Sequence, residues 1–106
     1  MSKHYIWNIE DVLPQKEKQY QSRVMLDEKK AGEPCIAVNH GLLEKGKTDA
    51  FVFDKAVVYI GLSGKAGVVV AGEVRPMKKG TVIYLPAHTE HYIENVDNES
   101  AEWLSM

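Results

Sequence analysis

The chain has 106 residues, a formal net charge of −2 and a sequence pI near 6.1, with 44% hydrophobic and 26% charged residues. This length fits one domain with one hydrophobic core, and the composition argues against an intrinsically disordered chain. Lysine and arginine are scattered along the sequence, so we expect no nucleic-acid partner. The longest apolar runs are only a few residues, so we expect no membrane-spanning helix.

The start of the chain and its cysteine content predict a cytoplasmic protein. The segment MSKHYIWNIEDV lacks the apolar core of a signal peptide. The single cysteine, Cys35, cannot form an internal disulfide, whereas a secreted domain of this size usually contains several. Because Cys35 lies in the apolar run CIAV, we interpret it as a buried small hydrophobe rather than a reactive thiol.

Residues 1–23 are predicted to form an N-terminal extension that packs on the main domain or on a partner chain. Asn8 can cap a short helix, Glu10 and Asp11 suit its first turn, and Pro14 would end it. The polar residues 15–23 that follow are expected at the surface.

Residues 24–106 are predicted to form an all-β domain. Short apolar runs such as VVYIGL, GVVVA and TVIYL alternate with turn signals, and no helical period intervenes. This pattern is typical of antiparallel sandwiches, barrels and jelly rolls. Residues 57–62 and 82–85 are apolar on both faces of their strands, so the outer side needs cover from a second sheet or a partner chain. We therefore expect a homodimer, the commonest closed oligomer.

The segment GTVIYLPAHTEHYIEN, from Gly80 to Asn95, is the most informative part of the chain. It resembles the second sequence motif of the cupin family, G-x5-P-x-G-x2-H-x3-N, and departs from it only at His88, where the motif usually has glycine. The resemblance covers roughly residues 36 to 106. It implies a double-stranded β-helix, or jelly-roll barrel, with His91 pointing into the mouth and Asn95 in a mainly structural role.

The first cupin motif, G-x5-H-x-H-x3,4-E-x6-G, has lost its metal ligands. Counted back from Gly64, its two histidine positions fall on Phe51 and Phe53, and its glutamate position falls on Val57. Phenylalanine and valine cannot coordinate a divalent ion, which needs several N or O ligands on fixed strands.

A second way of counting the first motif gives the same result. Counted forward from Gly46, the two histidine positions fall on Val52 and Asp54. The three-histidine, one-glutamate site of the family would therefore keep only His91. We expect no cofactor and no tightly bound transition metal.

An improvised divalent transition-metal site is the alternative to a metal-free protein. His88 and His91 lie three residues apart, and His40 and Asp54 lie elsewhere in the strand-rich region. Together these four residues could supply two or three imidazoles and one carboxylate. Considered singly, His40 and His88 are interpreted as surface residues and Asp54 as a turn residue.

The leading functional hypothesis is a small-molecule-binding cupin with a degenerate metal site and a ligand held in the barrel mouth around His91. The alternative is a small enzyme, an isomerase, epimerase, lyase or cyclase, that uses His91 as acid or base or operates with the improvised metal site. A third hypothesis is a structural partner of another enzyme. The residues expected to contact the ligand are His91, His88, Tyr59, Tyr84, Phe51 and Phe53.

Overall fold

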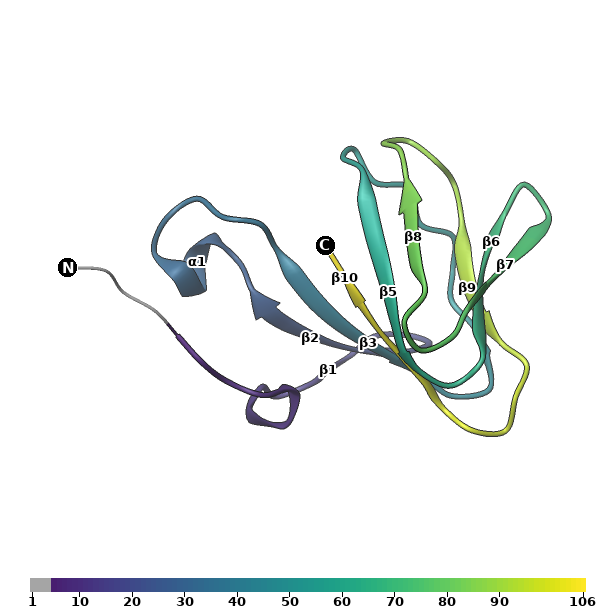
Figure 1. Ribbon diagram of the computed structural model, residues 1–106, viewed down its shortest axis with the longest axis horizontal. Coiled ribbons are helices and arrows are strands. Elements are labelled where there is room, and N and C mark those ends of the chain that lie inside the picture. Colours follow the sequence, from purple (N-terminus) through teal and green to yellow (C-terminus); the bar gives the residue numbers. More distant parts are fainter. Residues whose placement is uncertain (1–4) are drawn as a thin grey trace.

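Two antiparallel β-sheets build the protein in a computed structural model that describes residues 5–106 (Figure 1). The first sheet has the strand order β1-β2-β3-β10-β5-β8, with β1 Gln15–Lys16, β2 Gln21–Leu26, β3 Val38–Leu43, β10 Ala101–Ser105, β5 Val57–Ser63 and β8 Val82–Leu85. The second sheet has the order β4-β9-β6-β7, with β4 Gly46–Lys47, β9 Tyr92–Asn95, β6 Ala66–Val70 and β7 Glu73–Met77. The prediction of an all-β, jelly-roll type domain is confirmed.

The hydrophobic core lies between the inner faces of the two sheets. Because side chains alternate across a strand, every second residue of β5, β6 and β10 points inward. The six-stranded sheet contributes Tyr59 and Trp103, and the four-stranded sheet contributes Val68 and Ile93. The full set of buried core residues is Leu43, Val57, Tyr59, Ala66, Val68, Met77, Leu85, Ile93, Ala101 and Trp103.

The outer face of the six-stranded sheet is apolar along β5 and β8. Val58 and Ile60 of β5 point outward and are half-buried, and they pair with Tyr84 and Val82 of β8. Tyr84 and Val82 are 63% and 64% exposed. Within residues 5–106 no second sheet covers this face. The expected partner chain remains a prediction.

Strands β2 and β3 form an arm that extends from the rest of the molecule, with a short helix at its tip, α1 Glu28–Ala31 (Figure 1). This helix was not expected from the sequence. Its start is explained by Asp27, whose side chain accepts a 2.8 Å hydrogen bond from the backbone N–H of Lys30. Its end is explained by Gly32, which adopts the left-handed conformation with φ of 76°.

The N-terminal extension consists of a short turn followed by strand residues. The short helix is present as the 3-10 turn η1 Ile9–Asp11, where the Asn8 backbone N–H donates a 2.8 Å hydrogen bond to the Asp11 carboxylate. Residues 15–23 are exposed or half-buried, and they contribute β1 and the first half of β2. The sequence contained no sign of these strands, because the side chains are polar and sheet pairing uses backbone groups. Residues 1–4 lie outside the described part of the chain.

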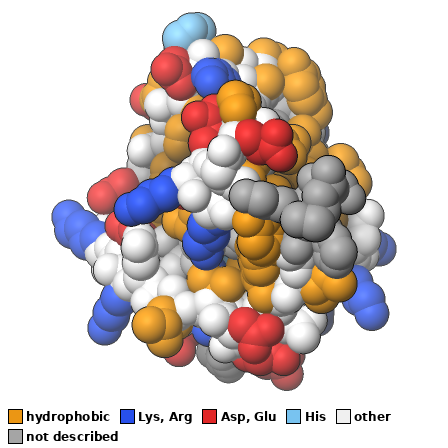
Figure 2. Space-filling model, turned by 90° about the vertical axis from the view of Figure 1, so that its left-hand side faces the viewer, with side chains coloured by type: hydrophobic (Ala, Val, Ile, Leu, Met, Phe, Trp, Pro, Cys, Tyr) orange, Lys and Arg blue, Asp and Glu red, His pale blue; other side chains and the backbone are white. Residues whose placement is uncertain are grey.

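Among the described residues, the surface at the end of the β2–β3 arm has no patch made only of acidic or only of basic side chains. Figure 2 shows acidic and basic side chains scattered among apolar ones. Across residues 5–106, no helix has the length and apolar character needed to cross a membrane.

Candidate ligand-binding site

A cavity of about 240 Å³ lies at the inner face of the six-stranded sheet. Its walls are mainly aromatic, and its polar groups come from neutral side chains. The aromatic residues are Tyr20, Phe51, Phe53, Tyr59 and Trp103, the polar ones are Ser22, Asn39 and Ser105, and the lining also includes His40, Gly41 and Ile93.

Strand register explains why the polar groups lie together. Asn39 of β3 pairs with Ser105 of β10, and Ser105 pairs with Tyr59 of β5. Residues directly opposite each other in an antiparallel pair share one face of the sheet. The amide and the two hydroxyl groups therefore form one row across three adjacent strands.

The next row of paired residues along these strands contains Trp103, whose ring lies on the inner face of the sheet. Trp103 pairs with Gly41 of β3, and a methyl group at Gly41 would lie only 2.3 Å from the indole ring. No side chain larger than hydrogen fits at this position. Gly41 therefore allows the indole ring to lie over β3 and line the cavity.

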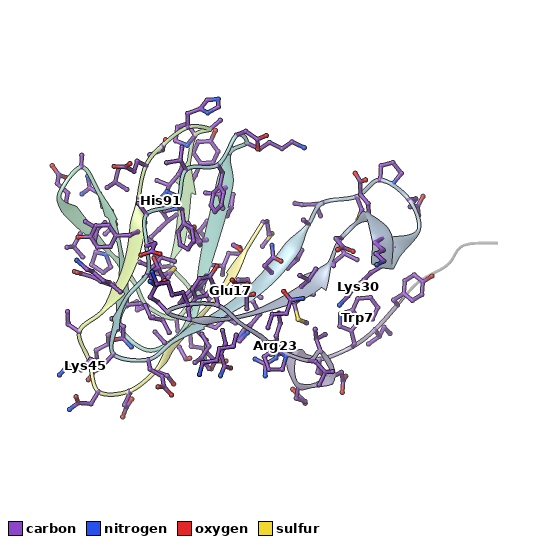
Figure 3. All side chains as sticks on the ribbon, turned by 180° about the vertical axis from the view of Figure 1, so that it is seen from behind. Trp7, Glu17, Arg23, Lys30, Lys45 and His91 are labelled. Atoms are coloured by element: carbon purple, nitrogen blue, oxygen red, sulfur yellow. The ribbon has the colours of Figure 1, made fainter. Side chains whose placement is uncertain are left out.

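His91, labelled in Figure 3, lies just before β9 and is buried, with 2% of its surface exposed. Its Nδ1 lies 2.8 Å from the Thr89 carbonyl oxygen, and its Nε2 lies 2.8 Å from the Tyr59 hydroxyl. A carbonyl can only accept, so Nδ1 carries the hydrogen and Nε2 of the neutral ring accepts from Tyr59. Burial raises the pKa of Tyr59 above its ordinary value, and nearby Tyr20 acts in the same direction. Tyr59 is therefore a protonated donor.

Phe51 and Phe53 separate His91 from the cavity. The two rings are stacked, with centroids 5.5 Å apart and planes at 20°, and each centroid lies 5.7 Å from that of His91. Both phenylalanines and Tyr59 line the cavity, whereas His91 does not. Phe51 and Phe53, the motif's histidine positions when counted back from Gly64, thus supply aromatic surface to the cavity, and His91 is joined to the cavity wall by its hydrogen bond to Tyr59.

Two residues expected in the mouth lie elsewhere. Tyr84 pairs with Val58 on the outer face of β8, because Ile83 is the residue opposite Tyr59. His88 is exposed and has a φ of 65°, the left-handed conformation that explains why the motif usually has glycine there. Neither residue lines this cavity, in contrast to the expectation that both lie in the barrel mouth.

His40 occupies a buried position on the outer face of the sheet, not the surface position expected for it. Its Nε2 lies 2.9 Å from Glu102 Oε1, and its Nδ1 lies 3.4 Å from a guanidinium nitrogen of Arg23. Ser63 donates a 3.0 Å hydrogen bond to the other oxygen of Glu102. Because Arg23 can only donate, Nε2 of neutral His40 carries the hydrogen and donates to Glu102. Figure 3 shows Arg23 on the side of β2 that faces the N-terminal segment.

The four residues of the improvised metal site are not brought together. Residues 5–106 contain no group of three or more His, Cys, Asp or Glu side chains that could hold a metal ion. His40 faces outward toward Glu102, His91 faces inward toward Tyr59, and His88 and Asp54 are exposed. The alternating pattern of the strands separates the two buried imidazoles.

Several cavity residues were missed by sequence reasoning. Trp103 was expected at a dimer face or a barrel end, although its place in the alternating run AEWLS is compatible with an inward position. The sequence around Tyr20 gave no indication that this residue lines a site, because its neighbours in sequence are polar. The ring centroids of Tyr20 and Trp103 nevertheless lie 6.3 Å apart.

Asn95 has the structural role that the second motif implies. Its side-chain amide donates to the carbonyl oxygens of Leu43 and Glu99 at 3.0 Å and 2.8 Å, and its oxygen accepts from the Asp97 N–H.

The family model described as "Cupin domain" matches residues 43–106, which is more than half of the chain. The chain is a cupin.

Among curated proteins, this cupin is similar to two archaeal enzymes over part of its length. It is 40% identical over 58 residues to the glucose-6-phosphate isomerase of Pyrococcus horikoshii and 38% identical over 58 residues to that of Pyrococcus abyssi. Each match covers 50% of this chain and 31% of the relative. The matched part is therefore about a third of the length of these enzymes.

Solved structures support the cupin fold over nearly the whole chain. The polyketide cyclase from Streptomyces resistomycificus has a TM-score of 0.84 at 17% identity, covering 99% of this chain and 78% of its own. A predicted oxalate decarboxylase from Thermotoga maritima has a TM-score of 0.81 at 17% identity, covering 95% and 96%. Ectoine synthase from P. lautus has a TM-score of 0.79 at 19% identity, covering 96% and 75%. At these identities the likeness concerns the fold alone.

Proposed function

We propose that this cupin binds a small molecule in the cavity between its sheets. The observation that carries the proposal is the lining, in which aromatic walls are combined with a few converging polar groups. This combination is typical of small-molecule sites. The hydroxyl and amide row of Tyr59, Ser105 and Asn39 lies on one wall, where it would orient the ligand.

His91 acts in this proposal as a positioning residue. By accepting from Tyr59 at 2.8 Å, it directs the hydroxyl hydrogen away from the cavity. The lone pairs of the Tyr59 oxygen then remain able to accept a hydrogen bond from the ligand. The ligand would contact Tyr59, and His91 would act through it.

The residues at the family's metal position do not fit a metal ion. Phe51, Phe53 and Val57 carry no donor atom, and both nitrogens of His91 are engaged, with Thr89 and Tyr59. One imidazole cannot hold a divalent ion tightly. The proposed binding therefore uses only hydrogen bonds and aromatic contacts.

A second candidate function is an isomerase, as the partial match to glucose-6-phosphate isomerases suggests. The Tyr59–His91 pair supports it, since the Tyr59 oxygen could accept a proton from a ligand while Tyr59 passes its own proton to Nε2 of His91, and the reverse transfers would return the proton to the ligand. An assay of glucose 6-phosphate and fructose 6-phosphate interconversion tests this candidate. Turnover that is lost in Tyr59→Phe would favour the enzyme over the binding protein.

Binding is tested by NMR with two tryptophan signals in one protein. The indole N–H of Trp103 reports on the cavity, whereas that of Trp7 donates to the Met25 carbonyl and serves as an internal control. We expect members of a set of neutral aromatics, sugars and sugar phosphates to shift the Trp103 signal alone. Ser105→Phe should abolish the shift by filling the cavity, and Ser100→Phe in an exposed turn should not. Binding unaffected by Ser105→Phe would contradict the proposal.

A further inference from the structure

The cavity has no acidic side chain and no permanently charged basic side chain in its lining among residues 5–106, and the ring of His40, which is in the lining, is bound to Glu102 on the outer face. No Lys, Arg, Asp or Glu side chain lines it within the described residues 5–106. Burial raises the pKa of Tyr59 and also that of Tyr20, so both phenols of the lining keep their protons at neutral pH. An anionic group that enters the cavity would lose its water without gaining a cation.

The nearest strand with a basic residue directs that residue away from the cavity. Arg23 on β2 donates to the Val12 carbonyl oxygen at 2.9 Å and faces His40 at 3.4 Å on the outer side of the sheet. Its neighbour on the inner side, Ser22, lines the cavity instead. The guanidinium group is therefore unable to reach a bound phosphate.

The mouth offers no positive field either. A groove adjacent to the cavity shares Asn39, Phe53 and Ser105 with it. The charged residues along this groove are three acids, Asp27, Glu28 and Asp54, and two bases, Lys29 and Lys55. A phosphate that projected from the cavity into the groove would meet a net negative rim.

The walls of the cavity are suited to a flat ring. Phe51 and Phe53 present nearly parallel rings, Tyr20 meets Phe51 edge-on at 89°, and Trp103 lies against the sheet. Aromatic surfaces favour planar π systems by offset stacking and edge contacts. Three neutral polar groups, those of Asn39, Ser105 and Tyr59, form one row on the wall made by the six-stranded sheet.

From these observations we infer that the site takes an uncharged planar ring compound with hydroxyl or carbonyl groups at one edge. It discriminates against phosphorylated or carboxylated forms of the same ring, because burial of an unpaired anion is costly. This inference rests on the proposed function and names its ligand class. In this preference the cavity differs from a site that binds sugar phosphates.

A matched pair of probes tests the inference: 2-naphthol and 2-naphthyl phosphate share a ring system and differ by the phosphate. We expect 2-naphthol to bind at least tenfold more tightly at pH 7 by calorimetry and to shift the Trp103 indole signal. In Ser105→Lys, which places a cation in the cavity, the preference should reverse, while the matched Ser100→Lys should behave as the parent protein.

The outcomes distinguish the inference from the proposed function. If 2-naphthyl phosphate or glucose 6-phosphate shifts the Trp103 signal with equal or higher affinity than 2-naphthol, the ligand class is wrong and small-molecule binding stands. If none of the probes shifts the Trp103 signal of the parent protein, both the inference and the cavity as a binding site are overturned.

Discussion

The Tyr59 hydroxyl donates a 2.8 Å hydrogen bond to Nε2 of His91, and both side chains are buried, at 2% exposure each. Thirty-two positions of sequence separate the two residues, so the bond joins β5 to the residue just before β9 across the inside of the fold. A buried polar group that loses its partner is destabilising, because water cannot replace it. The bond therefore bears on the stability of the domain as well as on the site.

Removal of the Tyr59 hydroxyl should destabilise the protein. In Tyr59→Phe the buried Nε2 of His91 loses its donor, and we expect the free energy of unfolding to fall by about 1–3 kcal/mol. Denaturant titration measures this change. The matched control is Tyr84→Phe, whose side chain is 63% exposed and should be neutral. Equal stabilities of the two variants would show that the buried bond contributes nothing.

Stability should fall at alkaline pH, and Tyr59 should be a main cause. Its folded pKa is raised above the unfolded value near 10, so the folded state holds its proton more strongly than the unfolded chain does. This contribution is fully present below about pH 10 and is lost as the pH rises above it. Above about pH 10 the free energy of unfolding should fall less with rising pH in Tyr59→Phe than in the parent protein or in Tyr84→Phe. Parallel curves for all three would contradict the assignment.

The outer face of the six-stranded sheet should form the homodimer interface. Val82 and Tyr84 are 64% and 63% exposed beside half-buried Val58 and Ile60, and an apolar face of this kind needs cover. We expect Val82→Glu to convert a dimer into a monomer in light scattering at micromolar concentration. Val74→Glu, at a 51% exposed valine on β7 of the other sheet, should leave the dimer intact. A monomeric parent protein would refute this prediction.

Purified protein should carry well under one tightly bound transition metal per chain. The reason is the chemistry of the residues: His91 uses both nitrogens, and phenylalanines occupy the motif's histidine positions. Elemental analysis after dialysis gives the metal content. Stoichiometric metal that is lost in the double variant His88→Ala, His91→Ala would establish the improvised site and contradict our expectation.

The sequence by itself determined the fold family and the direction of two key side chains. The motif from Gly80 to Asn95 indicates a cupin, and the spacing of His91 and Asn95 places both inside. These features are local, because a two-residue period and turn residues are written in consecutive positions. The inward direction of Tyr59 was not predictable in this way, because residues 57–62 are apolar on both faces of their strand.

Only the tertiary structure decided which side chains share the site. Tyr20 and Trp103 lie at opposite ends of the sequence, and their rings meet at 6.3 Å because β2, β3 and β10 are neighbours in one sheet. His40 and Glu102 meet on the outer face for the same reason, which removes His40 from any site shared with His91. The pairing and register of strands distant in sequence depend on the packing of the whole core, and no local pattern specifies them.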